Sequence, residues 1–120
     1  MGAIMARHMK RELGKLLEHR ATVYSRAVSV GTFTTVETSD LHCLLQQAAV
    51  NPGATNSERA VANDLRTLYF DPAYTLAENT QIAVDVESGI RWNVVNGSIV
   101  PDIGPGNVVV MRHCDLRRAR

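Results

Sequence analysis

The stretch LYFDPAYTLAENTQIAVDV, Leu68 to Val86, places two apolar runs with alternating side chains on either side of a proline and several polar residues. Alternation with a period of two is typical of β-strands that bury one face, and here Leu68, Phe70, Ile82 and Val84 are the core candidates. Proline among small polar residues indicates a turn. The stretch therefore predicts two strands joined as a hairpin, with DPAYTLAEN as a surface turn and no obvious chemical group.

The same period continues along most of the chain after residue 20. The candidate strands are RATVYSRAV (20–28), TFTTVETS (32–39), DLHCLLQQ (40–47), LRTLYF (65–70), TQIAVDV (80–86), IRWNVVN (90–96) and NVVVMRH (107–113). The apolar residues predicted to share one face are Leu41, Cys43 and Leu45 in the third run, Ile82, Val84 and Val86 in the fifth, and Ile90, Trp92 and Val94 in the sixth. Turn signals occur at Ser88-Gly89, at Asn96-Gly97 and in the cluster Pro101, Gly104, Pro105 and Gly106, so VDVESGIRW reads as a tight hairpin. This pattern predicts a mainly β fold, a small antiparallel β-barrel or sandwich of six to seven strands.

Two segments interrupt the strand pattern. Met5, Met9, Leu13, Leu16 and Leu17 recur at steps of three and four, which predicts an N-terminal amphipathic helix from about Ala6 to Glu18. The segment AAVNPGATNSERAVAND (48–64) is about 17 residues long, and loops of this length are usually functional or disordered. Its second half, SERAVANDL, favours a short helix capped by Asn56 or Ser57. The predicted organisation is a helix at 1–20, a barrel domain at 21–114 with a long loop at 46–64, and a basic tail at 115–120.

The net charge of +1 conceals an uneven distribution along the chain. Residues 1–20 and 112–120 each carry a net charge of +3, whereas residues 21–111 carry −5. A body of this sign repels phosphate, so tight nucleic-acid binding would depend on the two ends. The basic helix is compatible with binding to DNA or to an anionic membrane, but docking on its own barrel or on a neighbour is the more common role of an amphipathic helix.

Cysteine and histidine occur twice as a dipeptide, at His42-Cys43 and His113-Cys114. Neighbouring strand residues point to opposite faces, so the pattern favours two thiols near the core with histidines outside over a zinc site. Two cysteines in a domain of this size indicate a reducing compartment, and no apolar run is long enough to span a bilayer. With no recognisable catalytic motif either, we expect a soluble, non-exported protein that is not an enzyme and has no catalytic residues, metal or cofactor.

The order of these elements resembles the head-closure, or stopper, proteins in the neck of long-tailed double-stranded DNA bacteriophages. The phrases that carry the resemblance are TLYFDP (67–72), TQIAVD (80–85) and GIRWNVV (89–95), and the resemblance spans about residues 20–114. It implies a virion structural protein, made in the host cytoplasm, that forms a homo-oligomeric ring of six or twelve copies. Its implied partners are adaptor and portal proteins above the ring, tail terminator and tail tube proteins below it, and packaged DNA that passes through without sequence-specific binding; no membrane is involved.

The resemblance also assigns roles to particular residues. The long loop corresponds to one that helps to close the DNA channel, which makes Asn51, Pro52, Gly53, Thr55, Asn56, Glu58 and Arg59 the candidate channel residues. The residues themselves, rather than the resemblance, suggest the candidate contacts with a neighbouring subunit or ring. These are Tyr74 and Leu76, an apolar pair in the predicted surface turn, and Arg117, Arg118 and Arg120 in the basic tail. The alternatives are a nucleic-acid-binding small barrel of the OB type and another neck or tail completion protein.

Overall fold

The computed structural model describes residues 2–26, 31–47 and 52–119, and it is mainly β as the alternating pattern predicts. Its elements are, in chain order, α1 (Gly2–Gly14), β1 (His19–Ser25), β2 (Thr35–Gln47), α2 (Asn56–Asn63), β3 (Leu65–Phe70), β4 (Gln81–Val84), the 3₁₀ turn η1 (Asp85–Glu87), β5 (Trp92–Val94), β6 (Val100–Gly104), the 3₁₀ turn η2 (Pro105–Asn107) and β7 (Val108–Arg118). Six strands form a closed antiparallel barrel, and β6 is an additional strand outside it.

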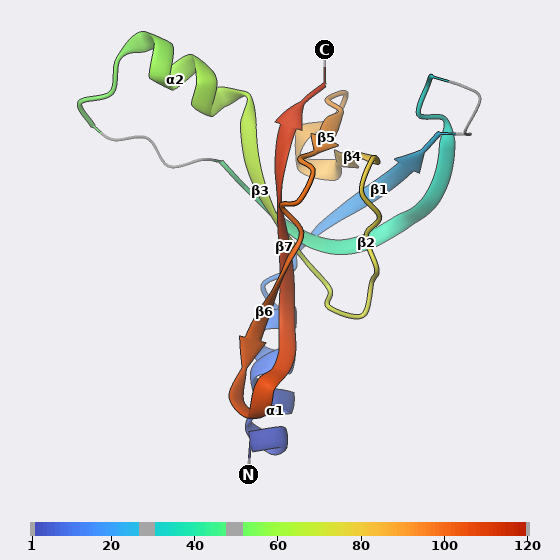
Figure 1. The fold of residues 1–120 in the computed structure, drawn as a ribbon, viewed down its shortest axis with the longest axis vertical. Helices are drawn as coiled ribbons and strands as arrows, with labels where there is room; N and C mark the ends of the chain where they lie inside the picture. Colours follow the sequence, from blue (N-terminus) through green and yellow to red (C-terminus); the bar gives the residue numbers. More distant parts are fainter. Residues whose placement is uncertain (1, 27–30, 48–51, 120) are drawn as a thin grey trace.

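The barrel closes between β3 and β7. Its strands follow the order β3-β2-β1-β4-β5-β7, and a ladder from Leu65–Arg117 to Phe70–Arg112 joins β7 back to β3. β7 is 11 residues long, so its later residues lie in the barrel wall between β3 and β5 while its earlier residues pair with β6. The β6–β7 hairpin extends from the barrel as a stalk, and α1 packs along it (Figure 1).

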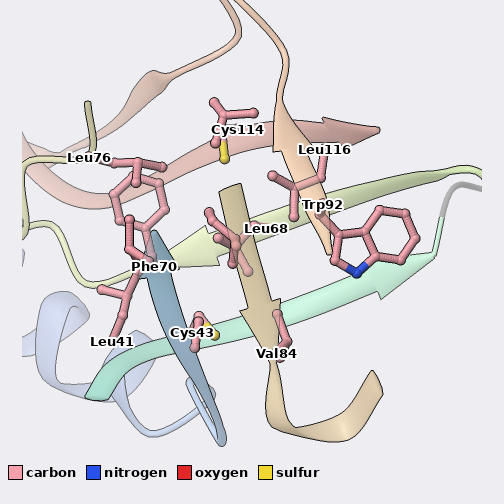
Figure 2. Packing of buried hydrophobic residues seen from close by; sticks show 13 residues of the cluster. Leu41, Cys43, Leu68, Phe70, Leu76, Val84, Trp92, Cys114 and Leu116 are labelled. Atoms are coloured by element: carbon pink, nitrogen blue, oxygen red, sulfur yellow. The ribbon is translucent and has the colours of Figure 1, made fainter. Parts of the chain in front are cut away.

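The barrel interior holds one apolar cluster. Its buried members are Ala21, Val23, Leu41, Cys43, Leu68, Phe70, Leu76, Ile82, Val84, Trp92, Val94, Cys114 and Leu116 (Figure 2). The inward faces predicted from alternation are confirmed for the pairs Leu41/Cys43, Ile82/Val84 and Trp92/Val94. The prediction was wrong for Val86, which is 54% exposed because β4 ends at Val84 and the chain turns into η1.

The predicted pairing of neighbouring runs is right for one hairpin and wrong for the other. β4 and β5 pair through Gln81–Asn93 and Ile82–Trp92, although η1 makes their connection longer than a tight turn. β3 and β4 do not pair, because β3 lies between β2 and β7 whereas β4 lies between β1 and β5. The connection at 71–80 is long enough to cross from one part of the wall to another, and closure of the barrel decides the partners.

Two strands differ from the sequence pattern for local reasons. The runs 32–39 and 40–47 were predicted as separate strands, but Thr35–Gln47 is one continuous strand whose register with β1 shifts near Val23. β6 was not predicted, because Pro101 and Gly104 are typical of turns. Proline is tolerated on an edge strand, and the turn itself is η2, where Gly106 and Asn107 have φ of 73° and 58°.

The two chain ends also differ from the prediction. The helix is Gly2–Gly14 rather than 6–18, and beyond Gly14 the chain continues in turns, such as the bond from the Leu17 N–H to the Gly14 carbonyl. The expected basic tail at 115–120 is not separate from the barrel, because β7 continues to Arg118 and pairs there with Trp92. Cys114 and Leu116 point into the barrel, and the charged residues between and after them point outward. This alternation is typical of a strand.

The contact between α1 and the stalk depends on Gly104. A Cβ atom added there would lie 2.6 Å from Val110 Cγ1 and 3.2 Å from Met9 Sδ. We therefore expect Gly104→Ala to lower the free energy of unfolding by about 1–3 kcal/mol through overpacking. Gly53→Ala is the control, since no described residue lies within 4 Å of its added Cβ. Unfolding in urea can be monitored by the fluorescence of Trp92. Equal urea midpoints for the two variants would contradict this close approach.

Candidate interaction surfaces

The apolar stripe predicted on the N-terminal helix is present, but only one edge of it is buried. Ala6 and Leu17 are covered, whereas Met5, Met9 and Leu16 are 42–58% exposed. Leu13 and Leu16 line a hollow of about 280 Å³ together with residues of the sheet: Leu44 of β2, Tyr69 of β3 and Met111 of β7. An apolar groove therefore lies between α1 and the outer face of the barrel.

The opposite flank of α1 is basic. Arg7, Lys10 and Arg11 line a second hollow of about 390 Å³, which is closed on its far side by His42 and by the turn at 71–73. Within the described part of the chain, no hydrogen bond or ion pair holds the side chains of these three cations. α1 thus has an apolar groove along one flank and unpaired basic side chains along the other.

The predicted long loop contains α2 and projects from the barrel as an arm (Figure 1). Thr55 caps the helix by accepting a hydrogen bond from the Glu58 N–H at 3.2 Å, so the predicted caps Asn56 and Ser57 are wrong. Arg59 donates to the carbonyls of Ala54 and Pro52, which holds the loop before the helix. Of the predicted channel residues, Pro52, Gly53, Thr55, Asn56, Glu58 and Arg59 all lie on this arm, and Asn51 lies outside the described residues.

The foot of the α2 arm lies beside the end of β7. The Arg118 N–H donates to the Asp64 carbonyl at 2.9 Å, and Arg117 and Arg118 line a hollow of about 310 Å³ with Val61. The candidate loop and the candidate basic contacts therefore meet at one end of the barrel. Arg120 lies outside the described residues.

A clamp that the sequence pattern did not indicate fixes the same end. Arg66 donates to Glu87 at 2.9 Å, and its guanidinium lies 4.7 Å from the centroid of the Trp92 ring. The Arg66 side chain also donates to the carbonyls of Asn63 and Leu65. Because Arg66 stands where α2 passes into β3, this network ties the arm to η1. Glu87 is 21 residues away in sequence and Trp92 is farther still, so no local signal could have shown the clamp.

The predicted surface contact at Tyr74 and Leu76 is not an exposed apolar pair. Leu76 is 6% exposed and belongs to the barrel core, and Tyr74 packs against that core. Burial and the nearby Glu37 carboxylate raise the pKa of Tyr74. The connection at 71–80 crosses the barrel and covers its interior, which explains why its apolar residues point inward. Leu76 is therefore unavailable to a neighbouring subunit.

The two His-Cys pairs have their thiols inside and their imidazoles outside, as alternation predicts. His113 Nδ1 lies 3.0 Å from Asp102 Oδ2, and His42 Nε2 lies 3.7 Å from Asp40 Oδ2. Among residues 2–26, 31–47 and 52–119, no three histidine, cysteine, aspartate or glutamate side chains gather as a metal site would require. The His-Cys pairs thus provide no tetrahedral ligand set.

Cys43 and Cys114 are free and fully buried, with Leu68 between them in Figure 2. Burial raises the pKa of each thiol to about 12. The negative charge of Asp85 adds to this effect at Cys43, and Asp115 does so at Cys114. A reactive cysteine needs an accessible thiolate, so these two residues are core packing groups.

Comparison of the chain with protein-family models, with curated proteins and with solved structures finds no match. Neither helix in the described residues is long and apolar enough to cross a bilayer.

The buried thiols predict chemical inertness and an alkaline loss of stability. Native protein should take up no thiol reagent at pH 8, whereas unfolded protein should take up one equivalent per cysteine. Since folding raises each pKa from 9.0 to about 12, the thiols' contribution to stability is complete below pH 9 and is lost as pH rises toward 12. The double variant Cys43→Ala/Cys114→Ala should show a smaller loss over that range in urea titrations. Rapid labelling of the native protein would contradict the burial.

Proposed function

We propose that this chain is a structural subunit of a bacteriophage neck, a head-closure protein that assembles into a ring, retains packaged DNA and provides a docking surface for the tail. The observation that carries the proposal is the placement of its exposed apolar side chains. Each element that projects from the barrel carries at least one exposed apolar side chain. The apolar residues with the largest exposed fractions are Ile4, Met5, Leu16, Val36, Val61, Val86 and Ile103. The proposal takes these side chains as the points at which neighbouring chains would pack.

The projections suit contacts with several neighbours at once. The stalk with α1 and the end bearing the α2 arm and the C-terminus lie at opposite ends of the long axis, which measures 47 Å (Figure 1). A subunit whose contact surfaces differ at its two ends makes head-to-tail contacts, which generate rings when the rotation closes. This arrangement supports a subunit placed between different rings.

The α2 arm is the element proposed to reach the channel. It buries only Ala62 of its eight residues, and Val61 on the same helix is 60% exposed. Isolated helices of this length are marginal in water, so the Thr55 cap and the Arg59 bonds matter for keeping it formed. The Arg66 clamp at its foot holds the direction in which it projects.

A small barrel that binds nucleic acid is the second candidate function. The unpaired cations Arg7, Lys10 and Arg11 favour it, and it requires DNA binding that weakens steeply with salt. The OB fold is a five-stranded barrel, whereas six strands close the barrel here, which separates this chain from the OB type.

The first test is electron microscopy of the particles made when the gene is deleted from its phage. The proposal expects separate heads and complete free tails, with heads that have lost their DNA. Complementation with the wild-type gene should restore joined particles. Intact infectious particles from the deletion strain would overturn the neck role and direct attention to the second candidate.

The basic residues near the C-terminus provide a finer test. We propose that these basic residues contact an acidic surface of the adaptor. The triple variant Arg117→Glu, Arg118→Glu and Arg120→Glu should then fail to incorporate into particles while keeping its urea midpoint, because it reverses the charge that such a contact requires. The matched variant with lysine at the three positions keeps the charge and should still incorporate. Normal incorporation of the glutamate variant would remove these residues from the interface.

A further inference from the structure

A hollow of about 450 Å³ lies on the outer wall of the barrel, between β5, β7 and the residues just before β4 on one side and the residues next to the β1–β2 turn on the other. Its polar and aromatic side chains come from separate segments: Arg26, Phe33, Asn79, Asn93, Asn96 and Arg117. None of the described residues that line it is an aspartate or a glutamate. It is thus a basic, amide-rich hollow on a chain whose middle segment is acidic.

Two of the side-chain amides that line this hollow have their oxygens already hydrogen-bonded. Arg117, Asn93 and Gln81 are in register across β7, β5 and β4, and Asn93 faces outward because Trp92 and Val94 point into the barrel. Gln81 Nε2 donates to Asn93 Oδ1 at 2.9 Å, and Arg26 donates to Asn79 Oδ1 at 3.2 Å. With these two amide oxygens occupied, the side-chain amino groups of Asn79 and Asn93 remain as donors.

The charged side chains that line the hollow are both basic. No hydrogen bond or ion pair engages the Arg117 guanidinium within the described part of the chain. Glu78 accepts from the Gly97 N–H at 2.9 and 3.1 Å and Glu37 is hydrogen-bonded to Ser25. Asp64 lines a neighbouring hollow together with Arg117 but does not line this one. Asp115 is two positions before Arg117 on the same strand and does not line the hollow. The charged groups that line the hollow are therefore two guanidinium ions.

The aromatic ring in the hollow is not available for stacking. The Arg26 guanidinium lies 5.2 Å from the centroid of the Phe33 ring, and Arg91 holds the Phe33 carbonyl at 3.4 Å. A site that reads a base needs a free aromatic face. Guanidinium and amide donors that are held in place, with no free aromatic ring beside them, suit an oxyanion ligand. Arginine suits phosphate in particular because its donors form a planar fork.

We propose that this hollow binds a phosphate group, supplied either by the DNA backbone or by free phosphate, with Arg26 and Arg117 as charged ligands and the Asn79 and Asn93 amides as additional donors. The site goes beyond the neck role, which needs no anion site, so either proposal can fail alone. It also assigns Arg117 a ligand other than a neighbouring subunit.

The test uses the full chain and two probes, inorganic phosphate and a short DNA duplex. Phosphate should shift the side-chain amide signals of Asn79 and Asn93 in NMR spectra. Arg26→Gln and Arg117→Gln should each weaken binding of the effective probe about tenfold, the range of one charge-assisted hydrogen bond. For the duplex, the slope of log affinity against log salt should fall by about 0.9 for each DNA phosphate that a variant no longer binds.

Arg118→Gln is the matched control, because it removes the same charge one residue along β7 and does not line the hollow. It should change affinity less than about twofold, well under the effect of removing a direct ligand. Asn93→Asp keeps the shape of the site but introduces a negative charge, so it should abolish binding without altering the urea midpoint. A response to either probe supports the site. A response to phosphate alone identifies free phosphate as the source, and a response that includes the duplex identifies the DNA backbone. Unshifted amide signals with both probes, or equal effects of Arg118→Gln and Arg117→Gln on affinity, would overturn it.

Discussion

The structure depends on the antiparallel ladder between β3 and β7. This ladder pairs residues far apart in sequence, from Leu65–Arg117 to Phe70–Arg112, and it turns an open sheet into a closed barrel. Closure brings Leu68 and Phe70 of β3 against Cys114 and Leu116 of β7 inside a single core. It also removes the two strand edges that an open sheet would leave unpaired, which are otherwise prone to association with other chains.

Because the barrel is complete in itself, the elements that extend beyond it are free to serve contacts. β7 is longer than the barrel wall and continues into the stalk, β1 and β2 extend into a hairpin, and the connection before β3 carries α2 (Figure 1). Each carries apolar side chains that this chain does not cover. The two thiols are buried and serve the core as packing groups. A small closed core with several projections is the basis of the proposed neck function.

The electrostatic pattern of the folded chain differs from the pattern along the sequence. Several basic residues are engaged within the fold: Arg66 with Glu87, Arg20 with Asp40, and Arg112 with the Pro72 carbonyl. In the described part, the cations without a partner include Arg7, Lys10 and Arg11 on α1 and Arg117 at the other end of the molecule. These cations without a partner line one hollow beside α1 and another beside β5 and β7.

The sequence alone determined the strand content, the inward faces of most strands and the position of the thiols, because these follow from a two-residue period that acts locally. Residues 65–70 were predicted as a strand with its observed bounds, and the α2 segment was predicted as a helix although its cap was misplaced. The tertiary structure decided which strands pair, where Leu76 points and which flank of α1 is covered. It also created the Arg66 clamp and the basic hollow, whose members come from distant segments. Those features result from long-range pairings, such as the β3–β7 and β5–β7 ladders, that no local pattern encodes.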